Sequence, residues 1–432
     1  MLKIVNSIPV AQVWSGHPVG FDLVTHGDRQ FAAFYDAERR MTVSCRGLDS
    51  GAWAFVRPEG RWLEGRNRPS TTIAWDSHNY VTMAIDGEGQ VHLCGNMHCD
   101  PLIYFRTTRP LDIFSFERID RMVGQNEERC TYPRFMRGPK GELVFRYRDG
   151  RSGDGVDYYN VYDAGTRTWR RLIDAPLLDG QGRMNAYARA PMPGPDGMYH
   201  LVWMWRDTPD CATNHDISYA RSRDLVRWET SRGEALALPI TLETGEVVDA
   251  VPPGGGTINM CLSLGFDTKQ RPIISYLKYD EAGATQAYNA RREAEGWKVS
   301  RTSDWAYRWA FSGGGAIPGE VQVGGVQVES DGGLNQSYRH IREGAGVWRL
   351  DEATLRPAGT YPPRKDALPE ALLKVASDFP GLEAHTLTGR GEGPEPGVRY
   401  VLRWETLPAN RDRPREQAPP PSELRLYELR LE

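Results

Sequence analysis

Histidine, tyrosine and arginine side chains lie close to the ends of several short apolar segments of this sequence. His78 occurs in the phrase WDSHNY, and His98 ends the phrase GNMH. Tyr132 lies in TYPRF, and Arg148 lies in YRDG. Histidine and tyrosine can transfer protons, and arginine can stabilise a carboxylate or an enolate-like charge. These residue types therefore predict proton transfer beside an anionic group.

Four further polar residues are candidates for substrate binding: Asn79, Tyr187, Arg206 and His215. They occur at matching places of consecutive segments. His215 lies in NHD, a phrase that could equally stabilise a loop by local hydrogen bonds. Ion pairs between neighbouring repeats are the favoured interpretation of Arg134, Arg146 and Asp149.

This set of side chains suits β-elimination from a uronic acid. The C5 proton of a uronate lies beside a carboxylate, which an arginine or a protonated histidine can hold while negative charge develops. A tyrosine or histidine then takes the proton and returns one to the leaving O4. In a glucuronate, H5 and O4 lie on the same ring face, so one side chain can act as both base and acid. Tyrosine suits this role where nearby cations lower its pKa.

Other chemistries have weaker support in the sequence. Cys94, His98 and Cys99 lie close together, as do Cys211 and His215, but neither set has the paired spacing of a structural zinc site. No pair of acidic residues recurs at the matching positions, as a glycosidase would require. The sequence also lacks the nucleophile elbow of a serine hydrolase.

The candidate residues occur within a sequence motif that is repeated along the chain. Each copy has a turn with Gly or Asp, a strand, a second strand rich in aromatic residues, and a Trp or Phe near its end. The turn glycines Gly89, Gly141 and Gly197 are 52 and 56 residues apart, a spacing typical of a four-stranded propeller blade. The sequence therefore predicts an all-β fold, a seven-bladed β-propeller.

The predicted propeller forms one domain over residues 1–432, with the ring closed by the N-terminal strand around VAQVW and the C-terminal strands around ELRLYELRLE. Inner strands of a propeller line the central channel, and their ends open onto one face. The His, Tyr and Arg side chains are expected to converge there. One short helix is predicted over residues 366–378, between blades.

Composition excludes several classes of partner. The formal charge is −4 and no basic face is evident, which argues against nucleic acid. No apolar run is long enough to cross a bilayer, so no membrane partner is expected. The first residues lack the pattern of a signal peptide. This predicts a cytoplasmic location, or a secreted or periplasmic one if a signal has been removed. The six cysteines are expected to be reduced.

Five phrases together resemble the BNR-repeat propellers of carbohydrate-active enzymes: WDSHN, GNMH, TYPRF, YRDGRSGDG and NHDISYARS. This group includes the ulvan lyases of polysaccharide lyase families 24 and 25 and the rhamnose-α-1,4-glucuronate lyases. It also includes the rhamnosidases of glycoside hydrolase family 145. The resemblance implies a polysaccharide or oligosaccharide lyase that cleaves L-rhamnose-α-1,4-D-glucuronate and leaves a 4,5-unsaturated glucuronate.

The resemblance also implies roles for individual residues. The histidine pair, tyrosine and arginine of the lyases correspond to His78, His98, Tyr132 and Arg148, with Tyr132 as base and acid. Tyr187 and Arg206 match further substrate-binding positions less closely. No cofactor is required for this chemistry. The resemblance allows a structural metal ion, whose ligands the sequence does not identify.

Two alternatives remain open at this stage. The related rhamnosidases resemble this sequence but use a single histidine on the opposite face, and His17 in WSGHPVGF matches that residue. His17 could equally be a turn residue that helps to close a blade. The second alternative is a sugar-binding propeller without catalytic activity.

Overall fold

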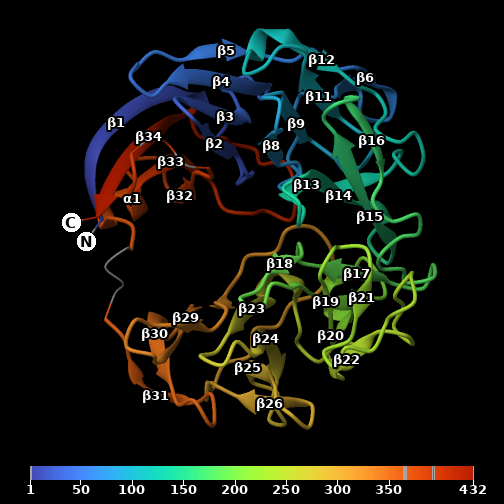
Figure 1. Cartoon of the computed structure of the whole chain (residues 1–432). Coiled ribbons are helices and arrows are strands. Elements are labelled where there is room, and N and C mark those ends of the chain that lie inside the picture. Colours follow the sequence, from blue (N-terminus) through green and yellow to red (C-terminus); the bar gives the residue numbers. More distant parts are fainter. Residues whose placement is uncertain (1, 363–366, 392, 394, 432) are drawn as a thin grey trace.

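The computed structural model describes residues 2–362, 367–391, 393 and 395–431, and antiparallel strands dominate it. Figure 1 shows the sheets side by side around a ring, with β2 and β8 toward the middle and β5 and β12 on the outside. One sheet has the order β2 (Asp22–His26), β3 (Arg29–Tyr35), β4 (Met41–Gly47), β5 (Ala54–Val56). The next has the order β8 (Val81–Ile85), β9 (Val91–Gly95), β11 (Tyr104–Thr107), β12 (Phe116–Arg118).

The largest sheet joins two such units. The first contains β10 (His98–Asp100), β13 (Cys130–Arg137), β14 (Leu143–Arg151), β15 (Asp154–Asp163) and β16 (Thr168–Arg171). The second contains β17 (Asn185–Ala188), β18 (Met192–Pro193), β19 (Tyr199–Arg206), β20 (Asn214–Ser222), β21 (Trp228–Glu229) and β22 (Glu246–Asp249). A single parallel bridge between Gly155 and Asn185 connects β15 with β17.

Three further sheets complete the ring. One contains β23 (Ser263–Phe266), β24 (Pro272–Tyr279), β25 (Thr285–Arg292) and β26 (Trp297–Arg301). The next contains β27 (Val321–Val323), β28 (Gln327–Val328), β29 (Leu334–His340), β30 (Gly344–Leu350) and β31 (Pro357–Thr360). The last has the order β1 (Leu2–Val13), β34 (Ser422–Leu431), β33 (Val398–Thr406), β32 (Glu383–Thr388). Dividing the largest sheet at its parallel bridge makes this arrangement consistent with the predicted seven blades.

The two ends of the chain meet in one sheet. β1 pairs with β34 from Leu2 opposite Leu431 to Val13 opposite Ser422. Figure 1 shows the blue β1 beside the red β34, with both termini at the same place. The first strand therefore belongs to the same blade as the last three, as the sequence predicts.

Tight turns between strands follow the repeated phrase. Gly89, Gly141 and Gly197 all have a left-handed backbone, with φ of 81°, 78° and 75°. Glycine adopts this conformation without a steric penalty. Each of these turns leads into the second strand of its blade, at β9, β14 and β19.

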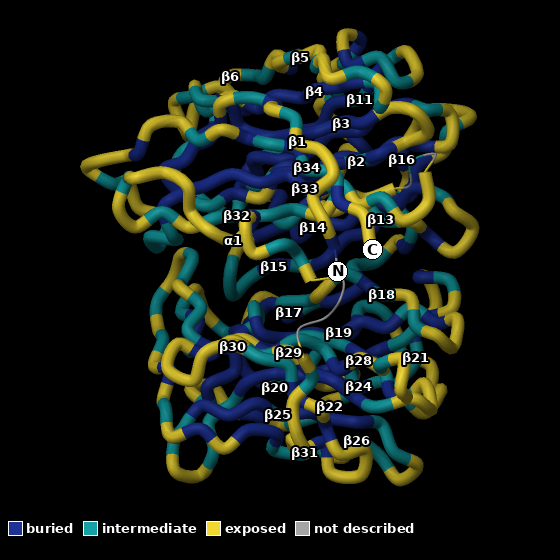
Figure 2. Tube along the Cα trace, turned by 90° about the vertical axis from the view of Figure 1, so that its left-hand side faces the viewer, coloured by how far each residue is buried: buried dark blue, intermediate teal, exposed yellow. Residues whose placement is uncertain are grey.

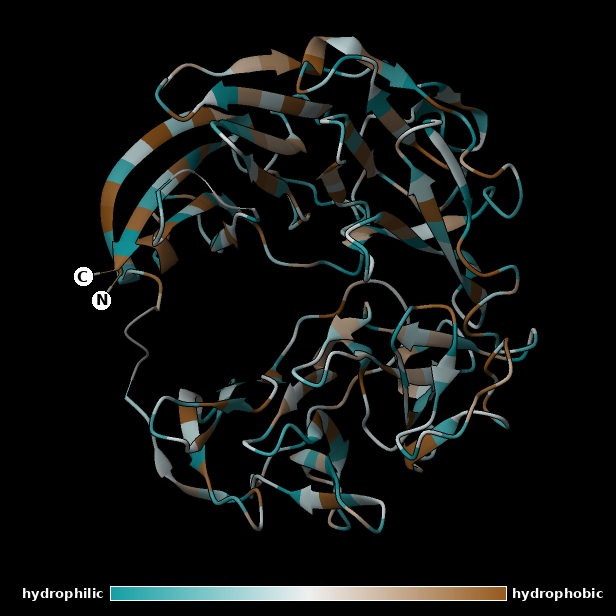
Figure 3. Cartoon of the chain, in the orientation of Figure 1, coloured by the Kyte–Doolittle hydropathy of each residue, from teal (hydrophilic) through white to brown (hydrophobic). Residues whose placement is uncertain are grey.

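The core lies between the sheets. Trp203 and Trp205 on β19 are fully buried, as are Phe31 and Phe34 on β3. Figure 2 shows buried strands in the interior and exposed turns at the edges. Figure 3 shows hydrophobic and hydrophilic bands alternating along β1. All six cysteines are free thiols, in agreement with the sequence prediction.

Some histidines are part of this core. His92 on β9 is completely buried, with Nδ1 2.7 Å from the hydroxyl of Tyr104 and Nε2 3.2 Å from Asp86. His200 makes matching contacts in a later blade. These residues tie a turn to a strand and are separate from the histidines of the candidate site.

Helical segments are short. Four one-turn 3-10 helices occur: η1 (Glu64–Arg66), η2 (Ile113–Ser115), η3 (Cys211–Thr213) and η4 (Asn259–Cys261). The short hairpin β6 (Trp62–Leu63) and β7 (Arg68–Pro69) flanks η1. Within the described part of the chain, no helix has the length and apolar character needed to span a membrane.

The predicted helix over 366–378 is wrong in its extent. The structure contains one turn, α1 (Glu370–Leu373), and residue 366 lies outside the described residues. The amides of Ala376 and Ser377 donate to the carboxylate of Glu405 on β33. These bonds to the neighbouring sheet replace the helical hydrogen bonds that would continue the segment.

Candidate active site

Asp76 bridges the two histidines that the sequence singles out. His78 lies in the loop before β8, and His98 begins β10. The Nδ1 atom of His78 is 2.8 Å from Asp76 Oδ1, and the Nδ1 atom of His98 is 2.5 Å from Asp76 Oδ2. The ring centroids of the two histidines are 4.3 Å apart. The structure thus brings His78 and His98 together through a carboxylate that the sequence reasoning missed.

A second carboxylate reaches the same histidine from the far end of the chain. Asp412 lies in the loop between β33 and β34, with Oδ2 3.4 Å from His78 Nδ1. Its Oδ1 atom accepts hydrogen bonds from the amide and the hydroxyl of Ser77, at 3.1 and 2.9 Å. Its Oδ2 atom accepts from the amide of Ala316 at 2.9 Å. Asp412 therefore fixes three segments of the ring around His78.

The two carboxylates determine the charge of His78. Burial alone would lower its pKa, but the hydrogen bonds with Asp412 and Asp76 outweigh burial and raise the pKa to about 10. Burial opposes ionisation of Asp76, and its hydrogen bonds with His78 and His98 nevertheless hold its pKa well below the usual range. At neutral pH, His78 is an imidazolium and Asp76 a carboxylate.

Tyr132 faces the histidine pair from a distorted strand. Its backbone has a φ of 58°, which is uncommon for a residue other than glycine. The pairing of β13 with β14 shifts register between Thr131 and Arg134, which is a β-bulge. Bulges redirect side chains and often occur beside active sites. The ring centroid of Tyr132 lies 5.9 Å from that of His78.

Tyr187 and two arginines complete the group. The rings of Tyr132 and Tyr187 have centroids 6.2 Å apart. The guanidinium carbon of Arg148 lies 5.0 Å from the Tyr132 ring and 6.0 Å from the Tyr187 ring. The guanidinium carbon of Arg206 lies 5.0 Å from the Tyr187 ring. The structure therefore brings together the six residues that the sequence predicts at one site: His78, His98, Tyr132, Arg148, Tyr187 and Arg206.

Arg148 has unused hydrogen-bonding capacity. It is buried, and its Nη2 atom donates to the hydroxyl of Thr131 at 3.2 Å. Its Nε and Nη1 atoms have no hydrogen-bond partner among the described residues. A buried donor without a partner is costly. This makes Arg148 a suitable group to receive a carboxylate.

The two tyrosines differ in acidity. Burial raises the pKa of Tyr132 above its usual value. Burial acts in the same direction on Tyr187, but the charges of Arg148 and Arg206 outweigh it and lower the pKa of Tyr187. The hydroxyl of Tyr187 also lies 2.7 Å from that of Ser152. Arg148 and Arg206 thus lower the pKa of both tyrosines, as the sequence predicts, but they outweigh burial at Tyr187 alone of the two.

Two further residues predicted to bind substrate are buried, and the side-chain oxygen of one of them, Asn79, has no hydrogen-bond partner among the described residues. Asn79 is buried, and its backbone carbonyl accepts a hydrogen bond from Tyr35 at 2.6 Å. His215 is buried between Asp207 and Asp216, each 3.0 Å from one of its ring nitrogens. For His215, this supports the alternative of a loop-stabilising residue.

His17 does not lie on a separate exposed face. It is 2% exposed, and its Nδ1 atom accepts a hydrogen bond from Trp14 at 2.9 Å. Its ring lies 5.8 Å from that of Trp75, the neighbour of Asp76. Burial lowers the pKa of His17 to about 4. His17 is thus buried beside the loop that carries Asp76, and its Nε2 atom has no hydrogen-bond partner among the described residues.

Arg146 and Asp149 form ion pairs, but within one blade and not between neighbouring repeats as the sequence predicts. Arg146 and Asp157 form a buried pair at 2.7 Å between the adjacent strands β14 and β15. Asp149 lies 3.9 Å from Arg129. Arg134 forms no ion pair or hydrogen bond with any described residue, so the prediction is wrong for this residue.

The histidine pair also bears on metal binding. Asp76, His78 and His98 are the one group of three His, Cys, Asp or Glu among the described residues whose ligand atoms lie within 4.8 Å of one another. Their spacings of 2.8 and 2.5 Å are those of hydrogen bonds. We therefore interpret the group as a proton-sharing cluster. Cys94 is buried on β9, and its thiol donates to the carbonyl of Ile103.

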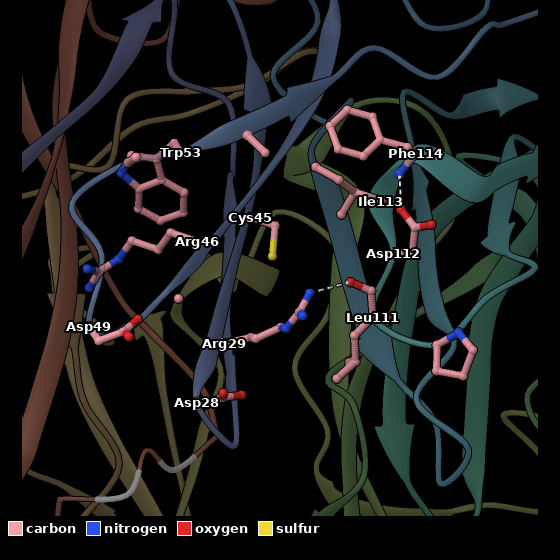
Figure 4. A pocket seen from close by; sticks show the side chains of 14 residues that line it. Asp28, Arg29, Cys45, Arg46, Asp49, Trp53, Leu111, Asp112, Ile113 and Phe114 are labelled. Carbon is pink, nitrogen blue, oxygen red and sulfur yellow. Dashed lines mark hydrogen bonds between the residues drawn. The ribbon is translucent and has the colours of Figure 1, made fainter.

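A cavity larger than any at the histidine pair lies between two neighbouring blades. It has a volume of about 790 Å³ and is lined by β3 to β5 on one side and by η2 on the other. Figure 4 shows Trp53 and Arg46 on one wall, Phe114 and Asp112 opposite, and Arg29 bonded to the carbonyl of Leu111. Neither histidine nor tyrosine lines this cavity. The residues predicted to transfer protons therefore lie outside this cavity.

Comparison with known proteins identifies the family. Residues 29–305, more than half of the chain, match the model described as BNR repeat-containing family member. The chain belongs to this family.

Two curated relatives come from Alteromonas sp. (strain LOR). An ulvan lyase is 22% identical over 317 residues, which cover 64% of this chain and 62% of the relative. A short isoform of ulvan lyase is 26% identical over 163 residues, which cover 33% of this chain and 29% of the relative. The chain thus spans less than two thirds of the length of these relatives.

Two solved structures share the fold along the whole chain. The polysaccharide lyase Uly1 superposes with a TM-score of 0.63 at 14% identity, covering 100% of both chains. A PL25 ulvan lyase superposes with a TM-score of 0.63 at 15% identity, covering 99% of this chain and 96% of the other. These similarities establish the all-β propeller fold.

Proposed function

We propose that this protein is a polysaccharide or oligosaccharide lyase that cleaves L-rhamnose-α-1,4-D-glucuronate linkages by β-elimination. The observation that carries the proposal is the cluster of two histidines, two tyrosines and two arginines around one polar site. The similarity to ulvan lyases supports it, and one such PL25 enzyme was solved bound to -[GlcA(1-4)Rha3S]-.

The cations of the site suit a uronate carboxylate. Arg148 has two unpartnered donors, and Arg206 lies against the same tyrosine. His78 is held as an imidazolium by its two carboxylates. Placed against a substrate carboxylate, these groups stabilise the negative charge that develops when C5 loses its proton.

Tyr132 is the proposed base and acid. Burial disfavours the phenolate form of Tyr132, and the charges of Arg148 and Arg206 favour it. In that form Tyr132 accepts the proton of C5, and the electron pair of the C5–H bond forms the C4–C5 double bond. The C4–O4 bond breaks, and Tyr132 returns the proton to O4. The products are a 4,5-unsaturated glucuronate and a sugar with a free hydroxyl. His78 and His98 are both hydrogen-bonded to Asp76, which connects them for proton transfer within the site.

The first experiment is a product analysis. The protein is incubated with gum arabic and with ulvan oligosaccharides, and the products are followed by ultraviolet absorbance and mass spectrometry. A uronate product one water lighter than the hydrolysis product supports the lyase. Free rhamnose with a saturated glucuronate would instead indicate a rhamnosidase. Saturable binding without any product would indicate a sugar-binding propeller.

A further inference from the structure

The cavity between the sheet of β2 to β5 and the sheet of β8 to β12 lies far from the candidate active site. β3 begins at Arg29, which lines the cavity, and ends at Tyr35, whose hydroxyl donates to the carbonyl of Asn79 beside His78. A strand rises about 3.3 Å per residue, so the length of β3 separates the two places by roughly 20 Å. The cavity therefore opens at the end of the strands opposite to the histidine pair.

The cavity has the size and the walls of a ligand site. Its volume of about 790 Å³ lies within the range typical of small-molecule pockets, roughly 300–1,000 Å³. Figure 4 shows Trp53 on one wall and Phe114 on the other. Phe114 is 64% exposed, Trp53 is half-buried, and the Nε1 atom of Trp53 has no hydrogen-bond partner in the described part of the chain. Two aromatic side chains thus face a space that no protein group fills.

The charges that line the cavity balance. Arg29 and Arg46 form no ion pair with a carboxylate of the described residues. The same holds for Asp28 and Asp49 with respect to the cations of those residues. The remaining acidic side chain of the lining, Asp112, is neutralised by an exposed arginine at 2.6 Å. Two unpaired guanidinium groups and two unpaired carboxylates favour a neutral ligand that has both hydrogen-bond donors and acceptors.

Arg46 is fixed in place beside the aromatic wall. It is buried, its Nε atom donates to Gln30 at 3.0 Å, and its Nη1 atom donates to the carbonyl of Ser50 at 3.0 Å. The guanidinium carbon lies 5.4 Å from the centre of the Trp53 ring. A sugar ring packs its C–H groups on an aromatic face while its hydroxyl groups bond to polar side chains at the edge of that face. The pair formed by Trp53 and Arg46 offers both contacts.

We propose that this cavity is a second carbohydrate-binding site, which takes a neutral sugar or a short neutral oligosaccharide between Trp53 and Phe114. Arg46 donates hydrogen bonds to its hydroxyl groups, and Asp49 accepts them. The inference goes beyond the proposed function and does not rest on it, because no residue of the candidate active site lines the cavity. A polymer held at this site is kept at high local concentration while another of its segments reaches the opposite face.

The test compares the Trp53→Ala variant with the wild type. The probes are L-rhamnose, D-galactose, D-xylose and their short oligosaccharides, with D-glucuronate as a charged probe. Binding is detected by saturation-transfer NMR, and dissociation constants are measured by calorimetry. Asp49→Ala is a second variant, because Asp49 is exposed and its replacement leaves the core intact. Phe55→Ala is the matched control, since Phe55 is an exposed aromatic residue of β5 that does not line the cavity.

We expect at least one neutral probe to bind the wild type, and Trp53→Ala to raise its dissociation constant about tenfold or more, as for a central aromatic contact of a binding site. Asp49→Ala should raise the dissociation constant by a smaller factor, because one hydrogen-bond acceptor is lost. Phe55→Ala should bind like the wild type. Thermal unfolding of all variants establishes that they are folded.

Three results would overturn the inference. The first is that no neutral probe binds the wild type at millimolar concentration. The second is that Trp53→Ala and Asp49→Ala bind the neutral probes as the wild type does, or that Phe55→Ala loses as much affinity as they do. The third is tighter binding of glucuronate than of every neutral probe at the same residues. Failure of the proposed function gives a different result: neutral sugars would bind in a way that depends on Trp53, but no unsaturated product would form.

Discussion

His78 and Asp412 meet across the closure of the ring, with 3.4 Å between Nδ1 and Oδ2, although they lie near opposite ends of the chain. Together with Asp76, Asp412 holds His78 as a cation. Asp412 also bonds to Ser77 and Ala316, so it orients the loop that carries the histidine.

The Asp412→Asn variant tests this relationship. The pKa of His78 is raised to about 10, so activity that needs the imidazolium should fall as the pH rises through that value. Loss of one neighbouring carboxylate lowers the pKa, and the basic limb of the kcat profile should move to lower pH by about one unit or more. Ser77→Ala, which removes a hydrogen bond but no charge, is the control and should leave the limb in place. An unchanged limb in Asp412→Asn would argue against a catalytic imidazolium.

The two tyrosines can be separated by replacing each with phenylalanine, which keeps the ring. Tyr132→Phe should lower kcat by about a hundredfold or more, the usual contribution of a general acid or base. Tyr187→Phe should mainly raise KM. The measurement is the initial rate of unsaturated product formation. The reverse pattern would assign the base to Tyr187, whose pKa Arg148 and Arg206 lower.

Stability should depend on pH through His78. Its pKa is raised from 6.5 in the unfolded chain to about 10 in the folded protein. The stabilisation is therefore complete below about pH 6.5 and is lost as the pH rises through about 10. The difference in unfolding free energy between wild type and His78→Gln should shrink across this window in urea titrations. A constant difference would show that His78 is not charged in the folded state. His26→Gln, at an exposed histidine of β2, serves as the comparison.

Removal of metal ions should leave the activity unchanged. The Nδ1 atoms of His78 and His98 already form hydrogen bonds with Asp76, so these atoms have a partner without a cation. The rate of product formation after dialysis against EDTA is compared with the rate before it. Loss of activity that a divalent cation restores would mean that a metal takes part in the site or in its stability.

The sequence predicts the site best where the candidate residues recur at matching positions of the repeats. The glycine spacing predicts blades, and the blade register predicts that His78 and Tyr132 approach each other, as they do. Asp76 could have been recognised, because it stands two residues before His78 in the same loop. Asp412 could not, because only closure of the ring brings its loop to His78.

The remaining errors have physical causes. An ion pair is predicted for Arg134 because such pairs between blades are common, but its side chain is exposed and stands opposite another arginine, Arg146, on β14. His17 was an open alternative by motif, and its burial could not be predicted from the motif. The composition of residues 366–378 favours a helix. Two backbone amides of this segment, however, donate hydrogen bonds to the carboxylate of Glu405.

The position of Asp412 has a consequence for synthesis of the protein. A nascent chain that has emerged as far as β31 already contains both histidines, both tyrosines and the arginines of the site. It still lacks Asp412 and β34, the strand with which β1 pairs. We therefore expect a fragment that stops at β31 to contain the side chains of the candidate site while lacking one of the two carboxylates that hold His78 as a cation.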